Sequence, residues 1–173
     1  METVILVDEF DNAIGEMEKM EAHEKGLLHR AFSIFLFNSS KQVLLQQRAL
    51  KKYHSPGLWT NACCSHPRPN EDLKEAALRR LGEELNVVAP IEEVFSFTYH
   101  ASFENGLIEH EYDHVFFGNY NGEIAYNTEE VMATEWYTIE EVEAMIEEAP
   151  LKLTPWFLIA WPLVKAQKFE DLK

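Results

Sequence analysis

The chain has 173 residues, of which 46% are hydrophobic and 12% aromatic, so it is long enough for one packed core and too aromatic for a disordered chain. Its 30 acidic and 15 basic side chains give a formal net charge of -15, which would repel nucleic acid and an anionic membrane surface. We therefore expect a single domain over residues 1–173, with a core at about 4–165, that binds neither nucleic acid nor membrane.

Three features of the sequence bear on the compartment. Residues 1–9 hold no basic region and only four consecutive apolar residues, so we expect no signal peptide. The apolar stretch at 153–164 is far shorter than the roughly 20 residues that span a bilayer. Cys63 and Cys64 are the only cysteines, and adjacent cysteines cannot close an unstrained disulfide. Reduced thiols are typical of a cytoplasmic protein.

The first part of the chain is expected to be mostly β. Residues 4–7 predict a strand, and Asp11, Asn12 and Gly15 mark a turn. Residues 30–38 and 42–48 predict a hairpin about 39–41. Residues 51–69 are rich in His, Pro, Ser and Asn, which predicts a long loop of the kind that often carries function.

The central part predicts a helix over 70–85, because Asn70 can cap it and Leu73, Ala77, Leu81 and Leu85 recur every fourth residue. The later elements are two strands joined by a turn (91–103 and 108–120), a hairpin strand at 124–126, a short strand at 135–138, and helices at 139–148 and 154–167. This order favours the α+β class, with mixed β-sheets packed against helices.

The predicted helix and the loop before it resemble the Nudix box, G-x5-E-x7-R-E-U-x-E-E-x-G-U with U aliphatic. Ser65 replaces the first Gly, Arg80 replaces the first metal-binding Glu, and Asn86 replaces the last Gly. A cation at position 80 would repel metal, but it can bind a phosphate oxygen. Arg80 and Glu84 lie one helical turn apart, so one can take a phosphate directly and the other through Mg²⁺. An exposed ion pair would show the same spacing.

Residues 60–67 carry a second, more specific resemblance. Their sequence, TNACCSHP, is similar to the T-N-x-x-C-G-H-P loop of type I isopentenyl-diphosphate isomerases, a Nudix-fold family, at five of six specified positions. Other segments match that family in order: 18–23, 28–32, 48–50, 56–59, 109–111, 154–156 and Trp161. The resemblance runs from about residue 4 to 161 and implies a single Nudix-like domain, with mixed β-sheets packed between helices.

The resemblance implies an isomerase of isoprenoid precursor biosynthesis that interconverts isopentenyl diphosphate and dimethylallyl diphosphate. Protonation of the alkene gives a tertiary carbocation, so the site needs an acid on one face and a base on the other. The resemblance assigns these to Cys64 and Glu111, without deciding which one protonates the alkene. Tyr99 would hydrogen-bond at the acid, and Trp161 would face the cation. An unpaired cysteine and both aromatic residues are also typical of an ordinary core.

The resemblance also implies a metal site for Mn²⁺, Mg²⁺ or Zn²⁺, whose ligands would be His23, His29, His66, Glu109 and Glu111. Glu109 and Glu111 alternate with His110 on a predicted strand, so both carboxylates face one side. Two solvent-facing acids would show the same pattern. The remaining histidines match no family motif and are not assigned: His54, His100, His110 and His114.

The substrate diphosphate would be held by Mg²⁺ on Glu84 and by four basic residues, Lys19, Arg48, Lys52 and Arg80. Two other functions stay open. A Nudix-type pyrophosphohydrolase would use the Glu that Arg80 replaces and has no use for Cys64. A non-catalytic ligand-binding module of Nudix fold is disfavoured by the retained Cys64, Glu109 and Glu111.

Overall fold

The sheet is built around β3 (His29–Phe37), whose residues are almost all buried. The structure is a computed structural model and describes residues 2–169. β3 pairs antiparallel with β1 (Thr3–Val7), β4 (Gln42–Arg48) and β6 (Cys63–Ser65). It pairs parallel with β8 (Ile108–Asn119), which comes much later in the chain. Two segments far apart in the sequence therefore lie side by side along the whole of β3.

The other strands extend this arrangement on both sides. β8 forms a long hairpin with β7 (Ile91–Ser102), β4 pairs with β5 (Trp59–Asn61) and β9 (Val131–Thr138), and β1 pairs with β2 (Ala13–Glu18). The helices are α1 (Lys19–Lys25), α2 (Leu73–Leu85), α3 (Ile139–Glu148), the short 3₁₀ helix η1 (Pro150–Lys152) and α4 (Pro155–Phe169). Within residues 2–169, no helix has the length and hydropathy needed to cross a bilayer.

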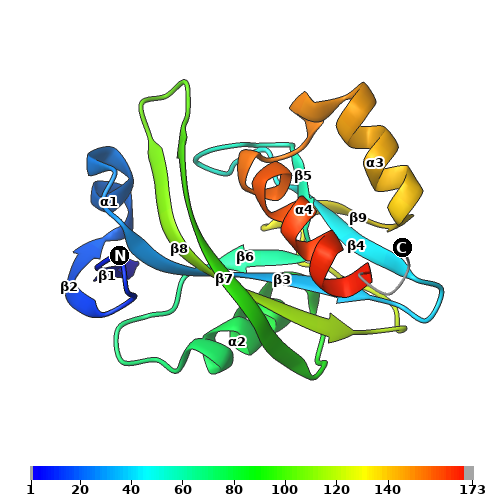
Figure 1. Cartoon of the computed structure of the whole chain (residues 1–173), viewed down its shortest axis with the longest axis horizontal. Helices are drawn as coiled ribbons and strands as arrows, with labels where there is room; N and C mark the ends of the chain where they lie inside the picture. Colours follow the sequence, from blue (N-terminus) through cyan, green and yellow to red (C-terminus); the bar gives the residue numbers. More distant parts are fainter. Residues whose placement is uncertain (1, 170–173) are drawn as a thin grey trace.

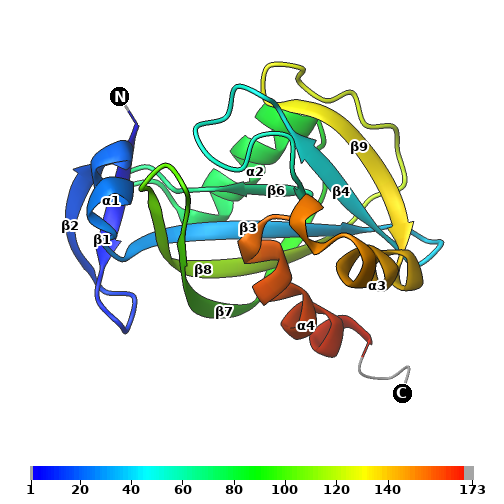
Figure 2. The same ribbon diagram turned by 90° about the horizontal axis from the view of Figure 1, so that it is seen from above.

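Both faces of β3 are buried, and successive side chains point to opposite cores. Phe32, Ile34 and Leu36 pack in a cluster with the apolar stripe of α2. Phe35 and Phe37 pack in a second cluster with residues of α3 and α4. Figures 1 and 2 show α2 on one side of the sheet and α3 and α4 on the other. The predicted α+β class, with a mixed sheet packed between helices, is confirmed.

The ends of α2 differ from the expected ones for a local reason. Asp72, not Asn70, caps the helix: its carboxylate accepts a hydrogen bond from the Glu75 backbone N–H at 3.1 Å. Asn86 ends the helix in the left-handed conformation (φ 53°), and its N–H donates to the Gly82 carbonyl at 3.0 Å. Asparagine adopts that conformation more readily than most residues, which explains how it can replace the last Gly of the box.

Several predicted boundaries also change. The loop at 51–69 contains β5 and β6, which use their backbones to pair with β4 and β3. No strand forms at 124–126, because this segment leads into a turn that docks on the end of α2, where Asn127 N–H donates to the Glu84 carbonyl at 2.8 Å. β9 begins at Val131 instead of 135, and Gly15 lies inside β2 instead of in the turn.

Candidate active site and metal centre

A buried cluster of three histidines and two glutamates lies where α1, β3, β6 and β8 meet. In the parallel register of β3 and β8, His29 lies directly opposite Glu111, and Glu109 is two residues earlier on the same face of β8. His23 comes from α1 and His66 follows β6. One ligand atom from each of the five residues lies within 4.8 Å of the others, and all five residues are buried. The five predicted metal ligands are thus brought together.

Hydrogen bonds to backbone carbonyls determine which ring nitrogen of His23 and of His29 carries the proton. His23 Nδ1 lies 2.6 Å from the Lys19 carbonyl and His29 Nδ1 lies 2.9 Å from the Leu27 carbonyl. A carbonyl can only accept, so both Nδ1 atoms carry the proton and each neutral ring turns the lone pair of Nε2 inward. These Nε2 atoms face carboxylate oxygens, 3.0 Å away on Glu109 and 3.2 Å away on Glu111. A ring nitrogen with a lone pair and a carboxylate oxygen repel each other unless a cation lies between them. This set of nitrogen and oxygen ligands therefore fits a divalent metal.

The charges in the cluster shift the pKa values of His29 and Glu111 toward the charged form of each group. Burial disfavours the charged form of His29, but the neighbouring Glu111 carboxylate outweighs it and raises the pKa of that ring, because a proton on Nε2 would also place a positive charge between the two atoms. Burial likewise opposes ionisation of Glu111, yet contacts with His29 and with His66, whose Nε2 lies 2.6 Å away, hold the pKa of this carboxyl well below its usual range. Glu111 is therefore ionised at neutral pH and free to bind a cation.

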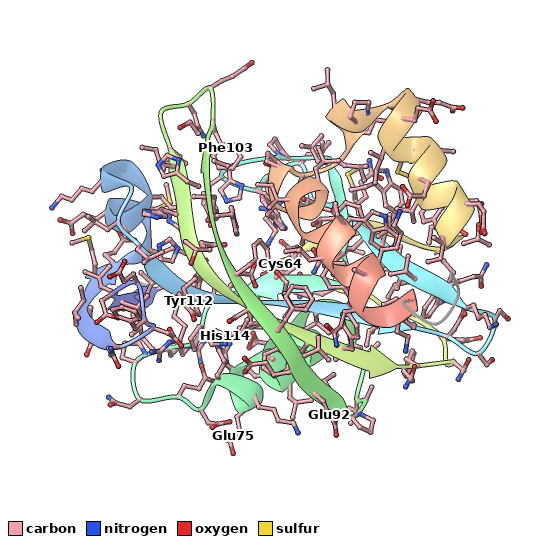
Figure 3. The ribbon with its side chains drawn as sticks, in the orientation of Figure 1. Cys64, Glu75, Glu92, Phe103, Tyr112 and His114 are labelled. Atoms are coloured by element: carbon pink, nitrogen blue, oxygen red, sulfur yellow. The ribbon has the colours of Figure 1, made fainter. Side chains whose placement is uncertain are left out.

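Glu111 also borders a cavity that contains Cys64. Glu109, Glu111, Tyr99, Cys64 and Trp156 all line this cavity. Figure 3 shows Cys64 near the centre of the molecule, well inside the tip of the β7–β8 hairpin where Phe103 lies. A small molecule in this cavity would therefore contact both the Cys64 thiol and the Glu111 carboxylate.

The Cys64 thiol is held by polar contacts with Asn61, Trp156 and Ser33. Its Sγ donates to Asn61 Oδ1 at 3.0 Å, and the Trp156 indole N–H donates to the sulfur at 3.2 Å. Burial, with the nearby charge of Asp113, raises the pKa of Cys64 to about 12. The thiol is thus protonated at neutral pH. Cys63 differs: it is fully buried in the core below α2, which is the ordinary structural role of an unpaired cysteine.

Tyr99 is placed where the expected hydrogen bond requires it. Its hydroxyl donates to Glu111 Oε1, across the β7–β8 pair in which the two residues lie directly opposite. Burial, with the charge of Glu111, raises the pKa of Tyr99 well above 10. The phenol therefore stays protonated and remains a donor to the carboxylate at neutral pH.

Trp161 does not border the cavity, contrary to the expectation. It is 1% exposed and packs in the second core, stacked on Phe157 with ring centroids 5.6 Å apart. Trp156 borders the cavity in its place, with its ring beside the Arg48 guanidinium. The two tryptophans are five residues apart on α4, about 140° around the helix axis, so they cannot face the same side. Trp156 belongs to the segment 154–156, which also matched the family pattern, so of the two tryptophans in that resemblance it is Trp156 that borders the cavity.

His54 is a cavity residue that the sequence reading missed. It lies in the loop between β4 and β5, is 4% exposed, and its Nε2 contacts Glu109 Oε1. Its ring stacks on Phe103, with centroids 4.7 Å apart, and meets Trp156 edge to face. The only signal was that the loop at 51–69 is rich in His, because His54 matches no motif.

Asp113 and Ser33 were also missed, and they lie behind Cys64. Ser33 Oγ donates to Asp113 Oδ2 at 2.8 Å and lies 3.6 Å from Cys64 Sγ. Burial raises the pKa of Asp113 well above its usual value. A signal was present, since Asp113 continues the alternation of Glu109 and Glu111 on the inward face of β8.

The predicted phosphate-binding residues surround a second cavity that shares Arg48, Cys64 and His66 with the first. We call it the cationic pocket; its basic residues are Lys19, Arg48, Lys51, Lys52 and Arg80. Lys51 was not expected there. A ligand could thus have an anionic group among the basic side chains while its other end reaches the cavity with Cys64 and Glu111.

Glu84 lies directly behind the cationic pocket, below Arg80. It is 3% exposed and accepts hydrogen bonds from Arg80 Nη2 at 2.8 Å and Gln46 Nε2 at 3.0 Å. The ion pair of Arg80 and Glu84 is therefore buried on the carboxylate side, and the alternative of an exposed pair is wrong. Glu84 does not itself border the pocket, and its role as an Mg²⁺ ligand stays a prediction.

Comparisons with known proteins agree with this geometry. The family model described as "NUDIX domain" matches residues 27–157. A protein from Photorhabdus laumondii named isopentenyl-diphosphate Delta-isomerase 2 is 51% identical over 172 residues, covering 99% of this chain and 96% of its own. A Burkholderia multivorans protein named isopentenyl-diphosphate Delta-isomerase is 50% identical over 156 residues, covering 90% of this chain and 89% of its own.

Solved structures show the fold at lower identity. A crystal structure from Deinococcus radiodurans has a TM-score of 0.71 at 23% identity, covering 86% of this chain and 90% of that one. The NUDIX domain of Shewanella oneidensis NrtR has a TM-score of 0.59 at 20% identity, covering 91% of this chain and 100% of that one. With the fold, the His/Glu cluster and relatives of about half-identical sequence in agreement, the chain belongs to the isopentenyl-diphosphate Delta-isomerases of the NUDIX family.

Proposed function

We propose that this enzyme interconverts isopentenyl diphosphate and dimethylallyl diphosphate by adding a proton to one carbon of the alkene and removing a proton from another. The observation that carries the proposal is that Cys64 and Glu111 line the same cavity; we place the alkene between them. One proton enters and one leaves in each turnover, so charge and atoms balance without any other reactant. The thiol and the carboxylate exchange the roles of donor and acceptor between the forward and reverse directions.

The substrate would lie across the two cavities. Its diphosphate would contact Lys19, Arg48, Lys52 and Arg80 in the cationic pocket, and Glu84, behind Arg80, would hold the Mg²⁺ that offsets the phosphate charge. Its five-carbon chain would reach the cavity that Cys64 and Glu111 share. Because remote phosphate contacts hold the alkene between two proton-transfer groups, the reaction becomes effectively unimolecular.

The chemistry at Glu111 depends on its neighbours. A divalent ion on His23, His29, His66, Glu109 and Glu111, with Mn²⁺, Mg²⁺ or Zn²⁺ as candidates, would supply the positive charge that fixes the Glu111 carboxylate. Tyr99 donates to the same carboxylate and orients its second oxygen. Glu111 and Tyr99 are buried, which keeps water from the reacting carbons, where it would otherwise capture a carbocation.

Trp156 takes the place that the sequence reading gave to Trp161. Its ring lines the cavity beside Cys64, so its face can stabilise a developing tertiary cation, a contact worth about 2 kcal/mol when desolvated. The adjacent free thiols Cys63 and Cys64 support a reducing compartment such as the cytoplasm for this reaction.

The proposal is tested by incubating isopentenyl diphosphate with the protein in D₂O. Nuclear magnetic resonance then follows the carbon skeleton and a phosphate assay follows hydrolysis. We expect deuterium in the new methyl group of dimethylallyl diphosphate and no release of phosphate. A pyrophosphohydrolase would release phosphate from an unlabelled skeleton. Phosphate release as fast as isomerisation would overturn the proposal.

A further inference from the structure

The cationic pocket contains nearly as many carboxylates as basic side chains. Glu2, Glu129 and Glu130 border it, and Glu84 lies behind Arg80. The ion pairs are Lys19 with Glu2, Lys51 with Glu129, Lys52 with Glu130, and Arg80 with Glu83, Glu84 and Glu130. Among the described residues, Arg48 is the one basic side chain of the pocket that forms no ion pair, and its buried Nε has no hydrogen-bond partner.

These pairs leave the pocket with little net charge. Five basic side chains and the four carboxylates Glu2, Glu84, Glu129 and Glu130 leave one positive charge, with Glu83 left out because its charge is also paired with Arg79. A diphosphate ester carries roughly two to three negative charges near neutral pH, so it exceeds what the pocket can balance. One bound Mg²⁺ lowers the charge of the ester to about minus one, which does match the pocket.

Glu130 is the carboxylate that interferes most directly with a phosphate. Its Oε2 lies 3.3 Å from Arg80 Nη2 and also contacts Lys52 Nζ, so it bridges α2 and the loop after β4. Its side chain is only 27% exposed, whereas the pair of Lys51 and Glu129 is 62% and 73% exposed. A phosphate oxygen needs the same donors as this carboxylate, so the two compete for Lys52 and Arg80.

We infer that Glu130 is a specificity-determining residue: its carboxylate competes with metal-free diphosphate for Lys52 and Arg80 and so restricts the pocket to diphosphates that carry a divalent cation. A diphosphate with bound Mg²⁺ brings positive charge toward Glu130, and the repulsion between carboxylate and phosphate is lost. The inference rests on the proposed function in one respect, namely that the substrate is a diphosphate.

The test uses inorganic pyrophosphate as the probe and the metal-loaded protein as purified. Its dissociation constant is measured by calorimetry in Mg²⁺-free buffer and at saturating Mg²⁺. In Glu130→Gln, which keeps the shape and loses the charge, metal-free pyrophosphate should bind about tenfold more tightly, as expected for removing one like charge within a few ångströms. The factor by which Mg²⁺ strengthens binding should fall by about the same amount. Thermal unfolding checks that the variant is folded.

Glu129→Gln is the matched control, because it removes a neighbouring charge from an exposed, screened pair. It should change metal-free binding by less than about twofold. Metal-free affinity that stays the same or weakens in Glu130→Gln would overturn the inference. The isomerisation assay in D₂O separates the two proposals. If the wild-type protein isomerises but Glu130→Gln shows no gain in affinity for metal-free pyrophosphate, only the role of Glu130 is overturned. If the wild-type protein neither isomerises nor binds pyrophosphate with Mg²⁺, both proposals are overturned.

Discussion

The two adjacent cysteines allow one chemical change to be made in two different environments. Cys64→Ala removes a thiol that borders the cavity, whereas Cys63→Ala removes one that is 0% exposed in the core. If Cys64 is one of two obligatory proton-transfer groups, its loss should lower kcat by about 10²-fold or more. That factor corresponds to about 2.7 kcal/mol or more in the barrier to reaction.

The structure predicts the opposite order for stability. Cys63 Sγ donates a weak hydrogen bond to Glu84 at 3.5 Å and fills a core packed on α2, so Cys63→Ala should lower the free energy of unfolding by about 1–2 kcal/mol. Cys64 borders the cavity, so the atoms lost in Cys64→Ala leave less unfilled core and should cost less stability.

The assay pairs isomerisation rates at saturating substrate with urea unfolding of both variants. We expect Cys64→Ala to be folded and inactive, and Cys63→Ala to be less stable but within a few-fold of wild-type kcat. An inactive Cys63→Ala beside an active Cys64→Ala would refute the reasoning, because the loop register that assigns the two thiols would then be shifted by one residue.

The remaining predictions concern the metal centre, the tryptophans and the tyrosine. Elemental analysis should find one tightly held metal per chain. Removing this metal should abolish activity even when free Mg²⁺ is supplied, and depleting free Mg²⁺ should abolish activity even when this metal stays bound. An active preparation without the tightly held metal would contradict the five-ligand assignment. Trp156→Ala should lower kcat by about 30-fold, because the aromatic face beside the reacting carbons is lost. Trp161→Phe should mainly lower the free energy of unfolding, by about 1–2 kcal/mol. A large loss of kcat in Trp161→Phe beside a small loss in Trp156→Ala would restore Trp161 to the site. The raised pKa of Tyr99 predicts that the rate deficit of Tyr99→Phe is constant over pH 6–9. Because the folded pKa exceeds the unfolded value, ionisation of Tyr99 favours unfolding, so wild-type stability should fall more steeply than that of Tyr99→Phe as the pH rises above about 10, measured by thermal unfolding. A rate deficit that titrates within pH 6–9 would contradict this.

The local elements of this protein are determined largely by its sequence. The four-residue spacing of Leu73, Ala77, Leu81 and Leu85 predicts α2, and the alternation of Glu109 and Glu111 predicts that both face one side of a strand. These patterns are readable because they depend only on the periods of a helix and a strand. The family motifs add the identity of the residues, including Cys64 and the three histidines.

The orientation of α4 about its axis is a feature that the sequence patterns do not determine. Phe157, Ala160, Trp161 and Val164 form the stripe that packs in the core, and Trp156 lies off that stripe. Two tryptophans on one helix are equivalent in composition, and the face that each one presents depends on which side of the helix meets the sheet. Only tertiary packing makes that choice, so the expectation for Trp161, which came from the family resemblance, could not be checked against Trp156 from the sequence alone.

The site itself is assembled by contacts between distant segments. The parallel register of β3 and β8 places His29 opposite Glu111, which lie 82 residues apart, and the loop before β9 brings Glu130 to Arg80, 50 residues away. His54 reaches Glu109 in the same way. No local period encodes such pairings, because they arise when separate apolar faces are buried against one sheet. The sequence by itself determined the elements and the chemical groups, and the tertiary structure decided which of those groups meet.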